Sequence, residues 1–449
     1  MTWSISKMSM RLSAILMILT IGISAYATVY QTAAQLIQEE QPTYPWPMFH
    51  HDATFAGYSQ SPAPNTSSLL WNYTLSSGVM CASPAVVEGR LFIQSEDNLV
   101  YCLNATSGVY LWKHLSEGTM QYTQGQYHPN RASPAVAEGR VFVGSIDDYM
   151  YCLNATTGEV IWRYKTGDDL YSFAVVAEGK VFTGSADFYI YCFNAETGEL
   201  VWKHNTGDWP FNPAVAEGKV FAGSHDNFFA LDAKTGAVLW EYTAESVISD
   251  SPCVADGKVF FADGGSPQGF VGARIHCLDA NTGQILWSAD APPAVFSSPA
   301  FAYGRVFVGS WNRNVYCLNP DDGAILWNYE TGDSVASSPA VADGKLYVGS
   351  NDGLIYCLNA TMGTPMWAYK IGREVKSSPA IADGRLYVVS REGTVFCFGG
   401  SLGQPSNPPA SPTNYEFYLL IAAVVIAMIF AAAYLYVKTR NRNLTPRNS

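Results

Sequence analysis

The stretch SSPAVADGKLYVGSNDGLIYCLNATMGTPMW (residues 337–367) contains four short apolar segments that are separated by three turn sequences. The turns are Asp-Gly at 343–344, Asn-Asp-Gly at 351–353 and Ala-Thr-Met-Gly at 360–363. An Asp-Gly pair between apolar segments is typical of a two-residue hairpin turn whose residues adopt positive φ. The stretch therefore predicts an antiparallel meander of four strands.

This unit recurs along the chain with a period of about 40 residues, which is typical of a β-propeller blade. Its first apolar segment begins, in order, at Ser83, Ser133, Phe173, Asn212, Ser251, Ser298, Ser338 and Ser378. Its last segment carries a tryptophan, in order Trp71, Trp112, Trp162, Trp202, Trp240, Trp287, Trp327 and Trp367. We therefore expect an all-β fold, an eight-bladed β-propeller of four-stranded antiparallel blades.

The two repeated segments are out of step by one unit. Trp71 comes before the first unit, and the last unit ends at VFCFGG (395–400) with no tryptophan segment of its own. The N-terminal strand around Trp71 is therefore expected to close the last blade. Such closure removes the open sheet edges that make a linear array prone to aggregation.

Most of the cysteines occupy one position of the repeat, where the fourth unit has Ala230. They are Cys102, Cys152, Cys192, Cys277, Cys317, Cys357 and Cys397. Neighbouring sheets pack roughly 10 Å apart, which exceeds the roughly 7 Å limit on the Cα separation of a disulfide. We interpret them as buried free thiols, with a disulfide or a metal site as the alternatives. Cys253 fits the same interpretation, and Cys81 has no assignment.

Two further repeated positions have structural interpretations. We expect the tryptophans to pack between blades instead of forming a platform for a ligand. An acidic residue follows the second strand at Asp97, Asp147, Asp187, Asp226, Asp352 and Glu392. Because it recurs at one turn, we interpret it as a cap of that turn and not as a catalytic carboxylate cluster.

The two ends of the chain predict a membrane-anchored extracellular protein. Lys7 and Arg11 precede an apolar stretch that ends in Ala-Tyr-Ala (25–27), as in a cleaved signal peptide, with an uncleaved anchor as the alternative. Residues 415–437 are long and apolar enough to span a bilayer, and the basic residues that follow predict a cytoplasmic C-terminus. The expected segments are a signal peptide (1–27), a linker (28–45), the propeller (46–400), a Pro/Ser-rich stalk (401–414), a single transmembrane helix (415–437) and a cytoplasmic tail (438–449).

Charge and motifs argue against several functions. The formal net charge of −12 disfavours a nucleic acid or an anionic membrane surface as the partner. His50 and His51 are adjacent, but no third ligand follows at a recognisable metal spacing. The sequence has no Gly-x-Ser-x-Gly, Walker or zinc motif. We therefore predict no catalytic residue and no metal site.

The combination of SPAV, YVGS and YCLNA segments with a closing tryptophan resembles the PQQ-like (quinoprotein) repeat of eight-bladed propellers. WPMFHHDATFAGYSQSPAPNTSSLLW (46–71) resembles the lead-in segment of such proteins, so the resemblance covers 46–400. It implies either a BamB-like scaffold without a quinone or a dehydrogenase. The dehydrogenases stack PQQ on a disulfide ring between adjacent cysteines and hold calcium with a Glu/Asn/Asp set. Because the chain has no Cys-Cys pair, we expect the non-enzymatic branch without a cofactor, with PQQ and calcium as the alternative.

Two segments are longer than their counterparts in the other units, namely 113–132 and 262–274. Alternating strand directions place both on the face that carries the connections between blades and the second turn of each blade, here called the connection face. The first and third turns lie on the opposite face, here called the turn face. Candidate N-glycosylation sites are Asn65, Asn72, Asn104, Asn154 and Asn359, and the last three fall in third turns. Glycans there would leave the connection face clear.

Residues just before the inner strands are expected to line the mouth of the central channel on the connection face. Aromatic residues come from blades 3 and 4, whereas blades 6 to 8 supply paired serines at 297–298, 337–338 and 377–378. The candidate binding face consists of Tyr171, Phe173, Trp209, Phe211, Arg131, Asp250 and Lys376. An aromatic wall opposite hydroxyls suits a glycan, a peptide end or a planar ligand, and aromatic filling of the channel is the alternative.

From these observations we expect a propeller that acts as a protein- or glycan-binding scaffold of the cell envelope. A PQQ-dependent or other quinoprotein-type oxidoreductase is the alternative.

Overall fold

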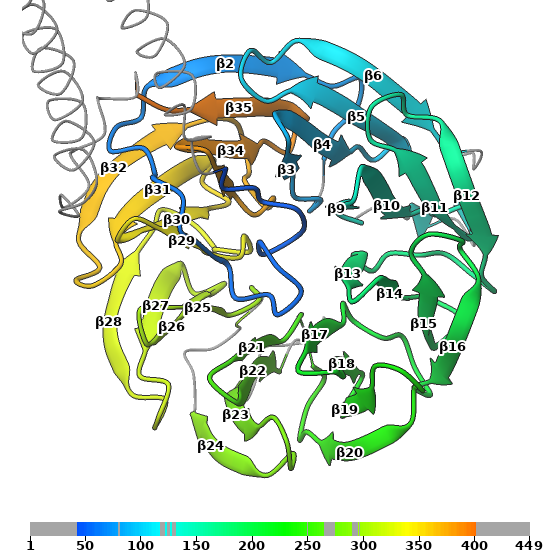
Figure 1. The fold of residues 1–449 in the computed structure, drawn as a ribbon. Helices are drawn as coiled ribbons and strands as arrows, with labels where there is room; N and C mark the ends of the chain where they lie inside the picture. The colour runs from blue at the N-terminus through cyan, green and yellow to red at the C-terminus, as the bar shows by residue number, and fades with distance from the viewer. Residues whose placement is uncertain are drawn as a thin grey trace, which may run out of the picture. The chain divides into compact units, whose positions relative to one another are not determined.

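The computed structural model describes residues 43–79, 81–116, 132–248, 250–264, 274–289, 295 and 297–400, and the backbone of 122–123 and 126–127. Their regular secondary structure consists of strands, most of which form eight blades of four antiparallel strands arranged as a ring (Figure 1). This confirms the predicted all-β propeller. The expected signal peptide, stalk, transmembrane helix and cytoplasmic tail lie outside the described residues, and within those residues no helix is long and apolar enough to cross a membrane.

Each blade runs from an inner strand at the channel to an outer strand at the rim. Blades 1 to 4 consist of β3 (Ala85–Val87), β4 (Arg90–Gln94), β5 (Leu99–Asn104), β6 (Tyr110–Leu115); β9 (Ala135–Ala137), β10 (Arg140–Gly144), β11 (Tyr149–Asn154), β12 (Val160–Lys165); β13 (Val175–Ala177), β14 (Lys180–Gly184), β15 (Tyr189–Asn194), β16 (Leu200–Asn205); and β17 (Ala214–Ala216), β18 (Lys219–Ser224), β19 (Asn227–Asp232), β20 (Val238–Thr243). A two-residue strand pair, β7 (Tyr122–Thr123) and β8 (Gln126–Tyr127), lies between blades 1 and 2 in sequence.

The remaining blades follow the same plan, except that the last is completed from the N-terminus. Blades 5 to 8 consist of β21 (Cys253–Ala255), β22 (Lys258–Asp263), β23 (Arg274–Asp279), β24 (Ile285–Ala289); β25 (Ala300–Ala302), β26 (Arg305–Gly309), β27 (Asn314–Leu318), β28 (Ile325–Glu330); β29 (Ala340–Ala342), β30 (Lys345–Gly349), β31 (Leu354–Asn359), β32 (Pro365–Lys370); and β33 (Ala380–Ala382), β34 (Arg385–Val389), β35 (Thr394–Phe398), β2 (Leu69–Thr74). A short strand, β1 (Tyr58–Ser59), pairs in parallel with β29.

Local sequence explains how a blade forms. The first hairpin turn of blade 7 has positive φ at both residues, 51° at Asp343 and 71° at Gly344, as the Asp-Gly pair predicts. The second and third strands are apolar without alternation because neighbouring blades cover both of their faces. In blade 2, for example, the side chains from Met150 to Leu153 are all buried. The outer strand alternates in exposure because one of its faces meets solvent.

The repeated tryptophans join neighbouring blades, as predicted. Trp162 donates its indole N–H to the backbone carbonyl of Ala195 in the next blade, at 3.1 Å. Its ring lies against Gly198 so closely that a Cβ at this glycine would be 2.5 Å from the indole. The same hydrogen bond connects Trp71 with Ala105, Trp112 with Ala155, Trp202 with Ala233, Trp240 with Ala280, Trp287 with Pro320 and Trp327 with Ala360.

The ring closes through the N-terminal strand. β2 pairs with β35, and Trp71 lies opposite Cys397, just as Trp162 lies opposite Cys152 in blade 2. The sheet order β2, β35, β34, β33 therefore completes blade 8 and confirms the predicted closure.

The lead-in segment fills the centre of the ring, where Figure 1 shows it in dark blue. It accepts backbone hydrogen bonds from the central residue of six inner strands in ring order. The donors are Val86, Val136, Val215, Val254, Phe301 and Val341, and the acceptors are Trp46, Pro47, Ala53, Thr54, Ala56 and Gly57, at distances from 2.6 to 2.9 Å. The lead-in segment thus provides acceptors for backbone N–H groups of the inner strands in blades 1, 2 and 4 to 7. Without it, these groups would line an open channel.

The adjacent histidines belong to this central segment. His50 is 1% exposed, its Nδ1 lies 3.1 Å from the carbonyl of Phe55, and burial lowers its pKa to about 4. His51 lies 3.5 Å from Asp52. Both have positive φ, 52° and 75°, and therefore form part of a tight turn inside the ring. They hold the lead-in segment in place.

The cysteines are free thiols, and those at the repeat position are buried. Burial raises the pKa of Cys152 to about 12, although Arg140 opposes this shift. A raised pKa keeps the group in the unreactive thiol form at neutral pH. Cys253 is buried on an inner strand, and Cys81 is half-buried.

Deletion of residues 46–75 should open blade 8 and empty the channel. We expect aggregation instead of a folded monomer, because the deletion exposes the edge of β35 and the hydrogen-bonding groups of six inner strands. Size-exclusion chromatography with light scattering measures this. A matched deletion of 46–60 keeps β2 and should leave a monomer with a lowered melting temperature. A monomer with unchanged melting temperature after the longer deletion would refute the closure.

The thiols should resist alkylation in the folded protein. We expect native protein to react with iodoacetamide first at half-buried Cys81 and slowly elsewhere, and denatured, unreduced protein to react at nearly all cysteines. Mass spectrometry of the modified peptides measures both. Pairs of repeat-position cysteines found linked in unreduced peptides would contradict this prediction.

Candidate functional site

The paired serines at the channel mouth hold the blades together. The backbone N–H of Ser298 donates to Ser338 Oγ, that of Ser338 to Ser378 Oγ, and each bond is 3.0 Å long. The series continues from Ser378 to Ser83 and from Ser83 to Ser133. Between blades 3 and 4 the N–H of Phe173 donates to the amide oxygen of Asn212 instead. These serines are buried, so their hydroxyls serve the scaffold and do not form a wall open to a ligand.

Phe173 belongs to the core of the channel. It is 8% exposed, and its ring centroid lies 4.3 Å from that of Phe49 in the lead-in segment. Phe173 therefore fills the channel, which was the alternative to a ligand-binding role. Phe211 is half-buried, and its N–H donates to Gly223 within blade 4.

Trp209 differs from the other aromatic candidates because it is 55% exposed. It lies in the connection from blade 3 to blade 4, where the corresponding positions of other blades hold Asp169, Ser334 and Glu374. Phe188, in the second turn of blade 3, is 41% exposed, and its carbonyl accepts the N–H of Thr206 in the same connection. The blade 3 to 4 region of the connection face therefore carries two exposed aromatic rings. Phe188 was not among the predicted binding residues, although aspartate, asparagine or glycine occupies its position in several other units.

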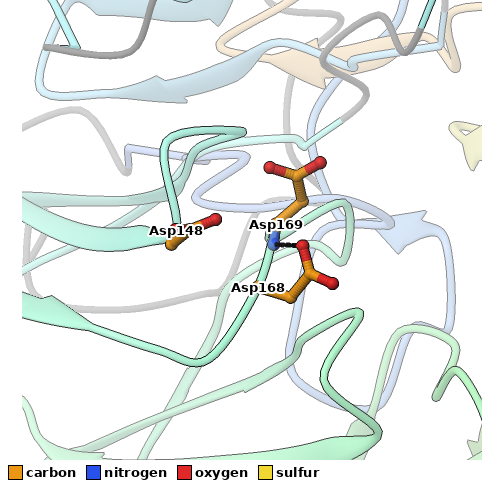
Figure 2. Close-up of side chains that lie close together, drawn as sticks. All are labelled: Asp148, Asp168 and Asp169. Carbon is orange, nitrogen blue, oxygen red and sulfur yellow. Dashed lines mark hydrogen bonds between the residues drawn. The ribbon is translucent and has the colours of Figure 1, made fainter. Parts of the chain in front are cut away.

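Three carboxylates lie together beside this region (Figure 2). Asp148 lies in the second turn of blade 2, and Asp168 and Asp169 lie in the connection to blade 3; one oxygen of each lies within 4.8 Å of the others. Burial raises the pKa of Asp148, Lys165 at 3.7 Å opposes this, and Asp168 adds to it. Tyr171 donates its hydroxyl to Asp169 and is half-buried. The cluster makes this part of the connection face acidic.

The charged candidates have different surroundings. Asp250 accepts the hydroxyl of Ser298 and the N–H of Ser251, both at 2.7 Å, and links blades 5 and 6. Burial raises its pKa to about 6, and these hydrogen bonds partly oppose the shift. Lys376 forms an ion pair of 2.9 Å with Glu374 in its own connection. Arg131 lies outside the described residues. The six candidates that the structure describes therefore take part in separate contacts.

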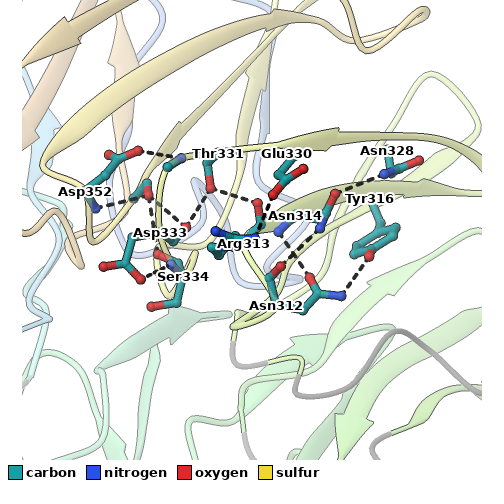
Figure 3. Close-up of polar contacts among 12 residues, drawn as sticks. Asn312, Arg313, Asn314, Tyr316, Asn328, Glu330, Thr331, Asp333, Ser334 and Asp352 are labelled. Carbon is teal, nitrogen blue, oxygen red and sulfur yellow. Dashed lines mark hydrogen bonds and ion pairs between the residues drawn. The ribbon is translucent and has the colours of Figure 1, made fainter.

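Three of the acidic residues after the second strands, Asp147, Asp187 and Asp352, cap their turns, as predicted. Asp352 accepts the N–H of Leu354 at 2.8 Å, the hydroxyl of Tyr356 at 2.6 Å and, from the preceding connection, the N–H of Gly332 at 2.8 Å. Figure 3 shows this region, in which Asn312 replaces the aspartate in blade 6 and contacts Tyr316. Asp352 thus bonds to its own turn, to the third strand of its own blade and to the connection that precedes this blade.

The repeated sequons coincide with another turn cap. Asn154 Oδ1 accepts the backbone N–H groups of Thr156 and Thr157 in the third turn, and Asn104 and Asn359 do the same in their blades. Asp232 and Asp279 make the same bonds without a sequon. Folding therefore explains why asparagine recurs there. Asn65 and Asn72 are exposed, and glycosylation of all five sites stays a prediction.

A family profile confirms the resemblance that the repeat suggests. The PQQ_2 profile, described as outer membrane protein assembly factor BamB, matches residues 63–130, 123–208, 186–271, 268–335 and 312–403. The chain belongs to this family. No curated protein sequence is significantly similar to it.

Solved structures share the fold at low sequence identity. Quinohemoprotein alcohol dehydrogenase from Comamonas testosteroni superposes with a TM-score of 0.67 at 16% identity, over 80% of this chain and 81% of the other. BamB from Moraxella catarrhalis has a TM-score of 0.59 at 17% identity, over 74% and 99%. The computationally designed Ika8 protein has a TM-score of 0.64 at 17% identity, over 75% and 100%. At these identities the similarity shows the fold alone.

The residues of this protein do not fit the quinone site that the resemblance to dehydrogenases implies. That site needs a disulfide between adjacent cysteines, and the chain contains no Cys-Cys pair. Its repeat-position thiols are buried on third strands. Among the described residues, the carboxylate cluster of Asp148, Asp168 and Asp169 lies in surface turns, whereas Phe49 and His50 fill the channel.

Replacement of Asp250 by asparagine should make the protein more stable at neutral pH. The pKa of Asp250 is higher in the folded than in the unfolded chain, so the wild type loses stability as the pH rises from about 4 through about 6. Asp250→Asn keeps an acceptor for Ser298 and removes the buried charge. We expect its melting temperature to exceed that of the wild type by several degrees at pH 7.5 and by less at pH 4. An equal difference at both values would show that titration of this carboxyl is not involved.

Proposed function

We propose that this propeller is a membrane-anchored binding scaffold of the cell envelope, with its partner-binding surface on the connection face of blades 3 and 4. The exposed indole of Trp209 carries the proposal. An exposed tryptophan gives the folded chain little stability, whereas a buried one at an interface contributes strongly to affinity. Family membership supports a scaffold role, and the apolar stretch 415–437 supports the anchor.

The chemistry of this surface suits a partner with basic and aromatic or apolar groups. Trp209 and Phe188 offer exposed rings, and Asp148, Asp168 and Asp169 place negative charge beside them. Rings surrounded by charged groups are typical of the centre and rim of protein interfaces. A positively charged segment of another envelope protein matches both features, and a glycan that stacks on the rings is the other outcome.

Loss of the Trp209 and Tyr171 rings tests the location, because Tyr171 contacts Asp169 of the acidic cluster beside Trp209. The ectodomain 28–414 is used to isolate its partner from the native envelope, and the dissociation constant is then measured with the purified partner by calorimetry. Trp209→Ala combined with Tyr171→Ala should weaken binding by roughly 1–3 kcal/mol, as expected for interface hot spots. Melting temperatures confirm that the variant is folded.

A second exposed tryptophan on the same face supplies the control. Trp311 is 41% exposed in the second turn of blade 6, and Trp311→Ala should leave the affinity unchanged. If affinity survives the double substitution and is lost on changing Glu138 and Glu178 in first turns, the functional surface is the turn face. The quinoprotein alternative predicts stoichiometric binding of PQQ with calcium, which absorbance spectra of the dialysed protein would reveal.

A further inference from the structure

Blade 5 departs from the repeat at three positions that meet in space. Asp263, at the end of β22, replaces a serine that the other seven blades share: Ser95, Ser145, Ser185, Ser224, Ser310, Ser350 and Ser390. His276 in β23 replaces an aromatic residue: Tyr101, Tyr151, Tyr191, Phe229, Tyr316, Tyr356 and Phe396. Ser288 follows the tryptophan of β24, where the other blades have Asn72, Lys113, Arg163, Lys203, Glu241, Asn328 and Ala368.

The three side chains form one chain of polar contacts. His276 Nδ1 lies 2.7 Å from Ser288 Oγ, and His276 Nε2 lies 3.0 Å from Asp263 Oδ2. Strand register sets this arrangement because His276 and Ser288 are directly opposite each other in the β23–β24 ladder. The side chains of His276 and Asp263 are 2% and 1% exposed, whereas Ser288 is exposed. The contacts therefore run from a buried carboxylate to a hydroxyl at the surface.

Neighbouring groups hold the imidazole and the carboxylate in place. The ring of His276 stacks on Phe261 with centroids 5.1 Å apart, and the ring of Tyr242 of blade 4 lies 5.9 Å from that of His276. Asp263 Oδ1 accepts the backbone N–H of Arg274 at 3.0 Å, which leaves Oδ2 directed at the histidine. His276 Nε2 and Asp263 Oδ2 are in ion-pair contact at 3.0 Å, and neither atom has a hydrogen-bond partner within the described part of the chain.

The scaffold does not require this arrangement. The other blades build the same three strands with serine and an aromatic residue, and burial of an ionisable pair costs several kcal/mol before any compensation. One such substitution could be a neutral variation. Asp263 and His276 each replace a residue type that the other seven blades retain, and both changes lie within contact distance of a serine at a variable position. Together they indicate a chemical property specific to blade 5.

We propose that Asp263, His276 and Ser288 form a hydrolytic triad in which Ser288 is a nucleophile toward carboxylic esters. The neutral imidazole holds a proton on Nε2, facing Asp263, and accepts the proton of Ser288 on Nδ1. The two ring nitrogens exchange the roles that they have in serine proteases, but each can carry or accept a proton. Asp263 stabilises the imidazolium that forms.

The proposed reaction needs only the ester and water. Ser288 Oγ forms a bond to the ester carbonyl carbon, the bond to the alcohol oxygen breaks, and His276 transfers the proton to the departing alcohol. Water then attacks the acyl-serine and gives a proton to His276. The bond between the acyl carbon and Ser288 Oγ breaks, His276 returns the proton to Oγ, and the carboxylic acid departs. β24 is the outermost strand of its blade, and an edge strand presents backbone N–H groups of the kind that stabilise an oxyanion. The exposed position of Ser288 suits an ester at an accessible surface.

A fluorophosphonate probe tests the proposal on the purified protein. Ser288 should displace fluoride and become phosphonylated, and peptide mass spectrometry identifies the modified residue. Ser288→Ala should abolish the labelling. His276→Tyr and Asp263→Ser introduce the residues of the other blades, so both variants should fold, and each should lower the labelling rate about 100-fold or more.

Blade 6 provides a matched control within the same molecule. Asn328→Ser places a serine at the same exposed position, beside Tyr316 and Ser310 in place of the histidine and aspartate. The introduced serine should react at the background rate while Ser288 in that protein reacts at the full rate. Equal labelling at the two positions, no labelling of Ser288 in the wild type, or full labelling in His276→Tyr would each overturn the proposal.

Discussion

The contact between a tryptophan of one blade and the third turn of the next is the interaction on which the ring depends. The indole donates a hydrogen bond to a backbone carbonyl and covers a glycine at van der Waals contact, so it fixes both distance and angle between neighbouring sheets. The glycine is required because a Cβ would overlap the ring and because its φ is positive, 74° at Gly198. Among the eight tryptophans, Trp367 has no partner for its indole N–H within the described residues, since blade 8 is built from two chain segments and has no third turn.

Two further sets of bonds act at the centre of the ring. The buried serines link successive inner strands at the connection face, and the lead-in segment bonds to six inner strands in order. An inner strand is the edge of its sheet, and its outward N–H groups need partners when water is displaced. The N-terminal segment therefore has two roles. It contributes the outer strand of blade 8, and it bonds to the inner strands at the centre of the ring.

Because the blades repeat, each serves as a reference for the others. A residue that recurs in most blades is explained by folding: the turn-capping aspartates, the sequon asparagines and the thiols all have structural roles of this kind. Folding of the blade does not explain a residue that only one blade carries. Trp209 is exposed at a position where other blades are polar, and blade 5 alone combines Asp263, His276 and Ser288. Both surfaces that we assign to function were identified by departure from the repeat.

Four features could be predicted from local spacing that repeats along the chain: the eight blades, the closure by the strand around Trp71, the positive-φ turns and the burial of the thiols. The tertiary structure decided what lies at the channel mouth. In the sequence, the serines and Phe173 resemble the lining of a ligand site. In the structure, the serines are buried in hydrogen bonds between blades, and Phe173 is buried against the lead-in segment. It also decided that Asp263, His276 and Ser288 meet. These residues come from three strands, and no short motif encodes them because strand register, not sequence proximity, brings them within hydrogen-bonding distance.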